Sequence, residues 1–345
     1  MNERANERMD GAPGTGAAAQ PAGDGAGYRA ATEAAAWIDR SARLRMEFSG
    51  THAAGTLNGL LTNDVTKLGP GTGHFAAALT PKGKLIADVR VLAFPDVFLV
   101  DADGSAGASF AGMIRKFVNP RLAKYRDVTN ETCDIGVFGP AAARAVASVT
   151  GADRELLSTL APFGSIGGVA AGSPVTIVRA VDLGVPGFDL IASSAMRSEI
   201  VAALGGAGLS PLDEGSAEVL RVEAGWPRWG ADYDENVLAQ EAAVDRLGGI
   251  SFDKGCYTGQ ETVARVHFRG HVNRTLRGLR ADTPVTPGAE LVASDGAVVG
   301  TVRTAASSPR LGEIALAYVR REVDDGATVS VAGTSATVVP LPFSG

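Results

Sequence analysis

The chain has 345 residues, of which 45% are hydrophobic and 20% are charged, and its formal net charge is −6 at pH 7. This composition indicates a globular protein of two or three domains, and the negative charge argues against nucleic acid or an anionic membrane as its main partner. Two cysteines and four scattered histidines are too few for a disulfide framework or for a metal site made by this chain alone.

The first 27 residues are rich in glycine, alanine and proline and lack the apolar stretch of a signal peptide. A segment of this kind buries too little apolar surface to order itself, so we expect a disordered tail over residues 1–27. The chain has no apolar run of about 18 residues, so we expect no membrane span. Together with the low cysteine content, this predicts a cytoplasmic protein.

Helices and strands alternate irregularly over the next 250 residues. Helical spacing predicts helices at 31–41, 52–68 and 108–118, and turn signals within 73–102 predict successive antiparallel strands. Residues 141–215 again mix helices with strands. This pattern is α+β, and we expect residues 28–274 to form one region of two interleaved subdomains.

The chain changes character after residue 274. Six short strand-like runs follow one another between residues 275 and 341, and Asp295-Gly296 suits a hairpin turn. Closely spaced short strands with such turns predict a small β-barrel over residues 275–345.

One of the two cysteines lies in an unusual segment, KGCYTGQE at 254–261. Thr258 and Glu261 match a capping box that would start a helix, with Cys256 just before it. A helix N-terminus and the neighbouring Lys254 both stabilise a thiolate, which predicts a reactive cysteine. The alternative is a buried cysteine that acts as a small hydrophobe, and this is the interpretation we favour for Cys133.

The segment 218–235 concentrates aromatic and charged residues, among them Arg221, Glu223, Trp226, Trp229 and Tyr233. A carboxylate beside aromatic faces suits a flat heterocycle with an amidine-like edge. The alternative is a helix end that packs on the core and exposes its glutamate.

These segments resemble a known family. KGCYTGQE at 254–261, LRVEAGWP at 220–227 and LLTNDV at 60–65 are similar to motifs of the YgfZ family, folate-binding proteins of iron–sulfur cluster assembly and repair. That family is related to the glycine-cleavage T-protein, an aminomethyltransferase. The resemblance implies a multi-domain ring around a central tetrahydrofolate site, closed on one side by the C-terminal barrel.

The resemblance also implies roles for individual residues. Glu223 would bind the pterin edge, while Cys256 and Arg265 would face the folate site. From the motifs we expect chemistry to involve Cys256, Arg265 and Lys254, and the cofactor to contact Glu223, Arg221, Trp226, Tyr257 and Gln260. No metal ligands are expected.

One departure bears on the reaction. The T-protein has a paired Asp-Asp in its folate site, whereas this chain has Ala87-Asp88, which argues against acid–base support for aminomethyl transfer. The resemblance therefore favours an assembly or repair factor for iron–sulfur client enzymes, including radical enzymes that modify tRNA. Its partners would be client or assembly proteins. The alternatives are a glycine-cleavage aminomethyltransferase and a non-catalytic folate-binding scaffold or sensor.

Overall fold

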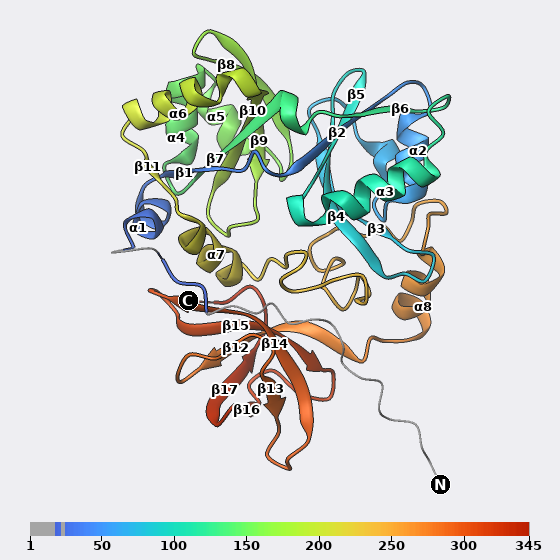
Figure 1. The fold of residues 1–345 in the computed structure, drawn as a ribbon, viewed down its shortest axis with the longest axis vertical. Helices are drawn as coiled ribbons and strands as arrows, with labels where there is room; N and C mark the ends of the chain where they lie inside the picture. The colour runs from blue at the N-terminus through green and yellow to red at the C-terminus, as the bar shows by residue number, and fades with distance from the viewer. Residues whose placement is uncertain (1–17, 22–24, 345) are drawn as a thin grey trace.

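A five-stranded antiparallel sheet carries the first half of the fold (Figure 1). The computed structural model describes residues 18–21 and 25–344. The sheet has the order β3-β4-β5-β2-β6, with α2 and α3 beside it. Its elements are β2 (Leu44–Ser49), α2 (Ala53–Leu60), β3 (Gly73–Leu79), β4 (Leu85–Ala93), β5 (Val97–Ala102), α3 (Gly107–Phe117) and β6 (Lys124–Asp127).

A six-stranded sheet lies next to it, in the order β11-β1-β7-β10-β9-β8. Its first strand, β1, precedes the five-stranded sheet in sequence and its other strands follow it, so the chain crosses between the sheets twice. Its elements are α1 (Ala26–Glu33), β1 (Ala36–Asp39), β7 (Thr132–Phe138), α4 (Ala142–Thr150), α5 (Arg154–Thr159), β8 (Ser165–Ala170), β9 (Ser173–Ala180), β10 (Gly187–Ser193), α6 (Arg197–Gly206) and β11 (Ser210–Pro211).

The C-terminal region is a closed barrel of six antiparallel strands in the order β12-β15-β14-β13-β16-β17. Apolar side chains such as Leu279, Val302 and Val338 fill its interior. The predicted barrel and the α+β class are therefore confirmed. Its strands are β12 (Arg274–Ala281), β13 (Glu290–Val292), β14 (Val298–Ser308), β15 (Gly312–Arg320), β16 (Thr328–Val331) and β17 (Thr334–Val339).

Figure 1 shows α7 (Glu214–Glu223) and the segment after it lying between the two sheets and the barrel. Between α7 and α8 (Gln260–Arg269) this segment forms turns and isolated bridges, and no named helix or strand. It bridges to Lys84 beside β4 through Leu238, and its Asp232 carbonyl accepts a hydrogen bond from Arg303 of the barrel. Loops placed on a rigid frame in this way are a common location for binding residues.

Two predictions about the N-terminal part need correction. The helix expected over 31–41 ends at Glu33, because residues 36–39 form β1, whose pairing with β7 overrides the helical preference of the alanines. The predicted tail of residues 1–27 lies mostly outside the described residues. Its described parts are structured, since Ala19 exchanges backbone hydrogen bonds with β14 and α1 begins at Ala26.

Candidate functional site

A pocket of about 560 Å³ opens where the two sheets meet α7. This volume is within the usual range for small-molecule and cofactor sites. Its lining contains more acidic than basic side chains. The lining residues are Ile38, Asp39, Arg40, Ala42, Arg43, Asp88, Asp103, Gly104, Ser105, Asp182, Leu183, Glu214, Ala217, Glu218, Arg221, Trp226, Pro227 and Arg228.

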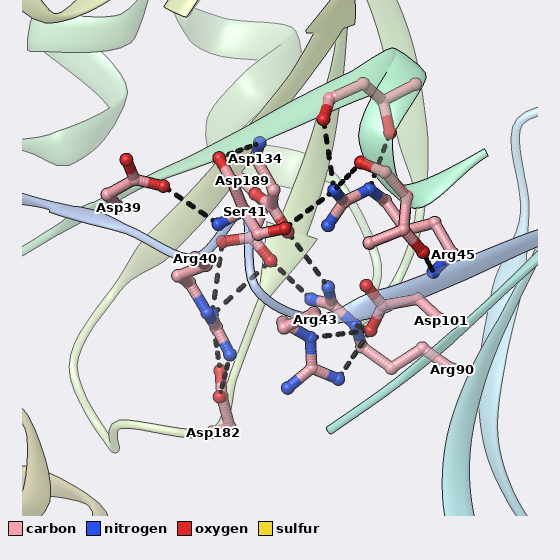
Figure 2. Close-up of polar contacts among 12 residues, drawn as sticks. Asp39, Arg40, Ser41, Arg43, Arg45, Arg90, Asp101, Asp134, Asp182 and Asp189 are labelled. Carbon is pink, nitrogen blue, oxygen red and sulfur yellow. Dashed lines mark hydrogen bonds and ion pairs between the residues drawn. The ribbon is translucent and has the colours of Figure 1, made fainter. Parts of the chain in front are cut away.

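Figure 2 shows a network of buried ion pairs between the two sheets, and some of its residues, such as Arg40 and Asp182, also line the pocket. Arg90 on β4 reaches across the sheets to Asp134 of β7, at 3.5 Å, and to Asp189 of β10. It also pairs with Asp101 of β5 at 2.9 Å. The Arg90 guanidinium thus links both sheets. Removal of this arginine would leave its acidic partners as uncompensated buried charges.

Two more arginines enter this network from the crossing between β1 and β2. Arg40 binds Asp189 at 3.1 Å and also binds Asp182, while Arg43 donates to Asp101 at 2.7 Å. The pKa of Asp182 is lowered to about 2: burial opposes this, but the charge of Arg40 outweighs it. The network fixes the crossing that lines the pocket.

Asp88 on β4 lines the pocket and forms no ion pair with an arginine among the described residues. It is partly exposed at the pocket wall and accepts a hydrogen bond from the Tyr233 hydroxyl. Burial raises the pKa of Asp88 to about 6, although the Tyr233 hydrogen bond and Arg43 act in the opposite direction. A carboxyl group with such a pKa can exchange a proton near neutral pH.

Ala87, the residue that departs from the paired acids, lies on the other side of β4. Successive side chains of a strand point to opposite faces. Ala87 is fully buried in the main core cluster, whereas Asp88 lines the pocket. The acid that Ala87 replaces would therefore lie in the core, and the carboxylate that faces this pocket is still present at Asp88.

The α7 wall of the pocket contains two of the predicted cofactor residues, Arg221 and Trp226. Arg221 is buried and pairs with Asp232 at 2.6 Å and with Glu218 at 2.7 Å. The Trp226 ring meets Phe75 edge-on, with ring centroids 5.1 Å apart. The Arg221 guanidinium is thus already paired with acids of the protein. Trp226 is the aromatic side chain in the pocket lining that a ligand could contact.

Glu223 is placed differently from the prediction. It lies two residues beyond Arg221, so it leaves the other side of α7 and is absent from the pocket lining. Its carboxylate is buried, accepts from the Tyr28 hydroxyl at 2.7 Å and pairs with Arg310 at 2.6 Å. Glu223 therefore joins α1, α7 and the barrel, and the structure does not present it as a pterin anchor in this pocket.

The cysteine segment also lies outside the pocket lining. Cys256 is a free, exposed thiol. Lys254 is buried and donates to the backbone carbonyls of Asn58, Leu61 and Asn63 at 2.6–2.8 Å. Burial lowers the pKa of Lys254 to about 8. Its ammonium group therefore holds the end of α2, and its effect on the Cys256 thiol stays a prediction.

The start of α8 differs from the predicted capping box. Its N-cap is Gly259 with φ of 83°, without a side-chain cap. The Thr258 hydroxyl instead faces the carbonyl of Gly59, 3.5 Å away. A Cβ at Gly259 would lie 2.6 Å from the carbonyl oxygen of Thr80. This glycine therefore lets α8 pack closely against the turn between β3 and β4. The prediction that it gives access to another molecule is not what this contact indicates.

The remaining predicted residues are also away from the pocket. Tyr257 is buried beneath Lys254, whose Nζ lies 4.9 Å from the ring centroid. Gln260 is partly buried at the start of α8, and Arg265 is exposed on that helix. None of the three belongs to the pocket lining, so the structure separates the cysteine segment from the pocket.

Several pocket residues were missed by the sequence reasoning, notably Arg40, Arg43, Asp103, Asp182 and Glu218. A signal for the adjoining network was available. Single charges interrupt otherwise apolar strands in VRVLA, FLVDA, CDIGV and GFDLIA. A charge in a buried strand needs a partner, so these four segments could have been predicted to meet.

Among the described residues, no group of three or more His, Cys, Asp or Glu side chains is arranged to hold a metal ion. No helix in that part of the chain is long and apolar enough to cross a membrane.

Comparisons with known proteins agree on one relationship. The family model of the GCVT N-terminal domain matches residues 20–254, and that of the glycine cleavage T-protein C-terminal barrel domain matches residues 274–344. Aminomethyltransferase from Saccharopolyspora erythraea is 29% identical over 335 residues, which cover 93% of this chain and 90% of the relative. Aminomethyltransferase from Nostoc sp. is 26% identical and covers 92% of this chain and 86% of the relative.

Among solved structures, glycine cleavage system aminomethyltransferase T from Bartonella henselae aligns with a TM-score of 0.82. The alignment covers 92% of this chain and 88% of that chain, at 21% identity. At this identity the likeness establishes a shared fold. It matches the arrangement of two sheets and a barrel described above.

Proposed function

The chain belongs to the family of the glycine cleavage T-protein, and on that premise we propose that its central pocket binds tetrahydrofolate and supports transfer of an aminomethyl group. The relatives that cover nearly the whole chain are named aminomethyltransferases. The observation that carries the proposal is Asp88, a carboxyl group that faces the pocket without an arginine partner among the described residues.

The residues of the pocket suit a reduced folate. A pterin ring offers N–H donors along one edge, and the pocket wall is rich in carboxylates that accept such bonds. Trp226 and Pro227 add apolar surface for a flat ring. The pocket volume of about 560 Å³ accommodates a cofactor of this class.

The chain's own contribution to the reaction would be proton transfer and positioning. Bound tetrahydrofolate would supply the nitrogen atoms that accept the one-carbon unit. Asp88 would take or return a proton at its carboxylate oxygen, since its pKa of about 6 leaves both forms populated near neutrality. The ion pairs of Arg40 and Arg43 would hold the crossing between β1 and β2, which lines the pocket, in place.

A reconstituted glycine-cleavage assay tests this proposal. The purified protein replaces the T-protein in a mixture with the aminomethyl-loaded lipoyl carrier and tetrahydrofolate, and methylenetetrahydrofolate is measured. Production above a mixture without the protein, and its loss in Asp88→Asn, supports the proposal. Tight binding of tetrahydrofolate without turnover would contradict the transfer and leave a folate-binding protein.

A second candidate function rests on a different observation. Cys256 is an exposed free thiol within KGCYTGQE, the segment that resembles the YgfZ family. For this reason we also propose a role in assembly or repair of iron–sulfur clusters in client enzymes. A single accessible thiol can bind iron or sulfur transiently, although it cannot complete a four-cysteine cluster site.

Complementation distinguishes the two candidates. A deletion strain carrying Cys256→Ser is assayed for the activity of [4Fe–4S] enzymes and for tRNA thiomethylation, with Cys133→Ser as the matched control. Loss with the first variant alone supports the iron–sulfur role. Full restoration by Cys256→Ser, together with turnover in the reconstituted assay, would leave only the transferase.

A further inference from the structure

Tyr233 lies directly behind the pocket acid. Its side chain is almost fully buried, at 1% exposure, and its hydroxyl donates to Oδ1 of Asp88. Its ring meets the Trp229 ring edge-on at 5.6 Å between centroids. A backbone hydrogen bond also fixes the turn that carries Tyr233: the Gly230 N–H donates to the Tyr233 carbonyl at 2.8 Å. The hydroxyl therefore has a fixed direction.

The surroundings of Asp88 leave Tyr233 as its side-chain donor. The charged and titratable groups that act on Asp88 are Tyr233, Arg43 and Asp103. Arg43 is committed to Asp101, and the Asp103 side chain caps the following turn by accepting from Ser105. The Asp88 carboxyl also lines the pocket, so a ligand there can reach it.

We propose that Tyr233 is a positioning residue that holds Asp88 for proton exchange, with Oδ1 bound to the phenol and the carboxyl at the pocket wall. The proposal deepens the proposed function and rests on it. Burial and the neighbouring Asp88 raise the pKa of Tyr233 far above its ordinary value. The phenol thus remains a donor throughout the working range and stabilises the carboxylate form of Asp88.

The substitution Tyr233→Phe tests this, because it removes the hydroxyl and keeps the ring packed on Trp229. Tyr318→Phe is a matched control: Tyr318 is also buried, and its hydroxyl has no partner among the described residues. The protonation of Asp88 is followed by carbon-13 NMR of aspartate-labelled protein, with the signal assigned through Asp88→Asn. Loss of a donor to the carboxylate should move the Asp88 titration upward by at least about one pH unit.

In the transfer assay the acid limb of the pH profile should move upward in Tyr233→Phe by the same amount, and Tyr318→Phe should change neither readout. An unchanged Asp88 titration in Tyr233→Phe would overturn the proposal. The NMR experiment needs no folate. If the titration shifts but the protein neither binds nor uses tetrahydrofolate, then the proposed function is rejected and the Tyr233–Asp88 coupling stands as a separate result.

Discussion

Asp88 differs from the other buried acids of this region because it lacks an arginine partner among the described residues. Asp101, Asp182 and Asp189 each pair with arginine and so serve the scaffold. We predict that Asp88→Asn lowers the rate of aminomethyl transfer by about 10²–10⁴-fold, the usual contribution of a general acid–base group. Its affinity for tetrahydrofolate should change much less. The single-turnover rate at saturating folate measures this, and an unaltered rate would assign the acid–base role elsewhere.

Substitution of Glu223 should affect stability, in contrast to the effect on catalysis predicted for Asp88. Its carboxylate is almost fully buried, bonded to Tyr28 and Ser308 and paired with Arg310. Glu223→Gln keeps the size and removes the charge, so we expect the free energy of unfolding to fall by about 1–3 kcal/mol. Urea denaturation measures the loss. A stable variant with tenfold weaker folate binding would instead restore Glu223 as the pterin anchor.

At the level of elements, the segment that contains Cys256 is held by Lys254. The ammonium group donates to three carbonyls near the end of α2. Lys254→Met keeps the aliphatic stem and leaves these acceptors unsatisfied, so we predict a loss of about 1–3 kcal/mol in the free energy of unfolding. Lys82→Met, at an exposed turn, is the control and should be nearly neutral. Hydrogen exchange should show the loss of protection in α2 and residues 251–259.

At the level of the whole molecule, the ion-pair network joins the two sheets and makes stability depend on pH. Burial and the nearby Asp189 raise the pKa of Asp134 to about 7, despite Arg90 and Arg40. In the unfolded chain this group has an ordinary value of 3.8. Between these values the folded state binds one more proton, so this group's contribution to stability falls as the pH rises.

The variant Asp134→Asn isolates this contribution, because asparagine resembles the protonated acid at every pH. His74 acts in the opposite sense, since burial lowers its pKa to about 4, and it is common to both proteins. Relative to the wild type, the variant should gain up to about 1.4 kcal/mol per pH unit between pH 5 and pH 7. Urea denaturation across this range tests it. A constant difference between the two proteins would contradict the raised pKa of Asp134.

The sequence predicted the large features of this molecule better than its site. Hydrophobic alternation and turn residues were enough for the barrel and for the strands β3 to β5. They failed at β1, which is extended because it pairs with β7, a strand about 100 residues later in the chain. Spacing along the chain could place Cys256 and Lys254 together. It could not reveal that the lysine turns away to carbonyls about 190 residues distant in sequence.

The pocket was harder to predict because its lining comes from five separate segments. Its acid was noticed only through its neighbour Ala87. Ala87 and Asp88 differ in the face of β4 on which their side chains lie, because successive side chains of a strand point to opposite faces. Ala87 therefore lies in the core and Asp88 in the pocket lining. Tyr233, the partner of Asp88, and Tyr28, the partner of Glu223, are each distant in sequence from their acid. No sequence motif links either tyrosine to its acid.

The measurement that tests the central claim most directly is calorimetric titration of tetrahydrofolate into the wild type and Ala42→Trp. Ala42 is exposed and lines the pocket, so a tryptophan there should fill part of the space without altering the core. Ala207→Trp, at the exposed end of α6, is the matched control. We predict binding by the wild type and the control, and at least a tenfold weaker affinity in Ala42→Trp, which corresponds to about 1.4 kcal/mol. Equal affinity in all three proteins would contradict folate binding in this pocket.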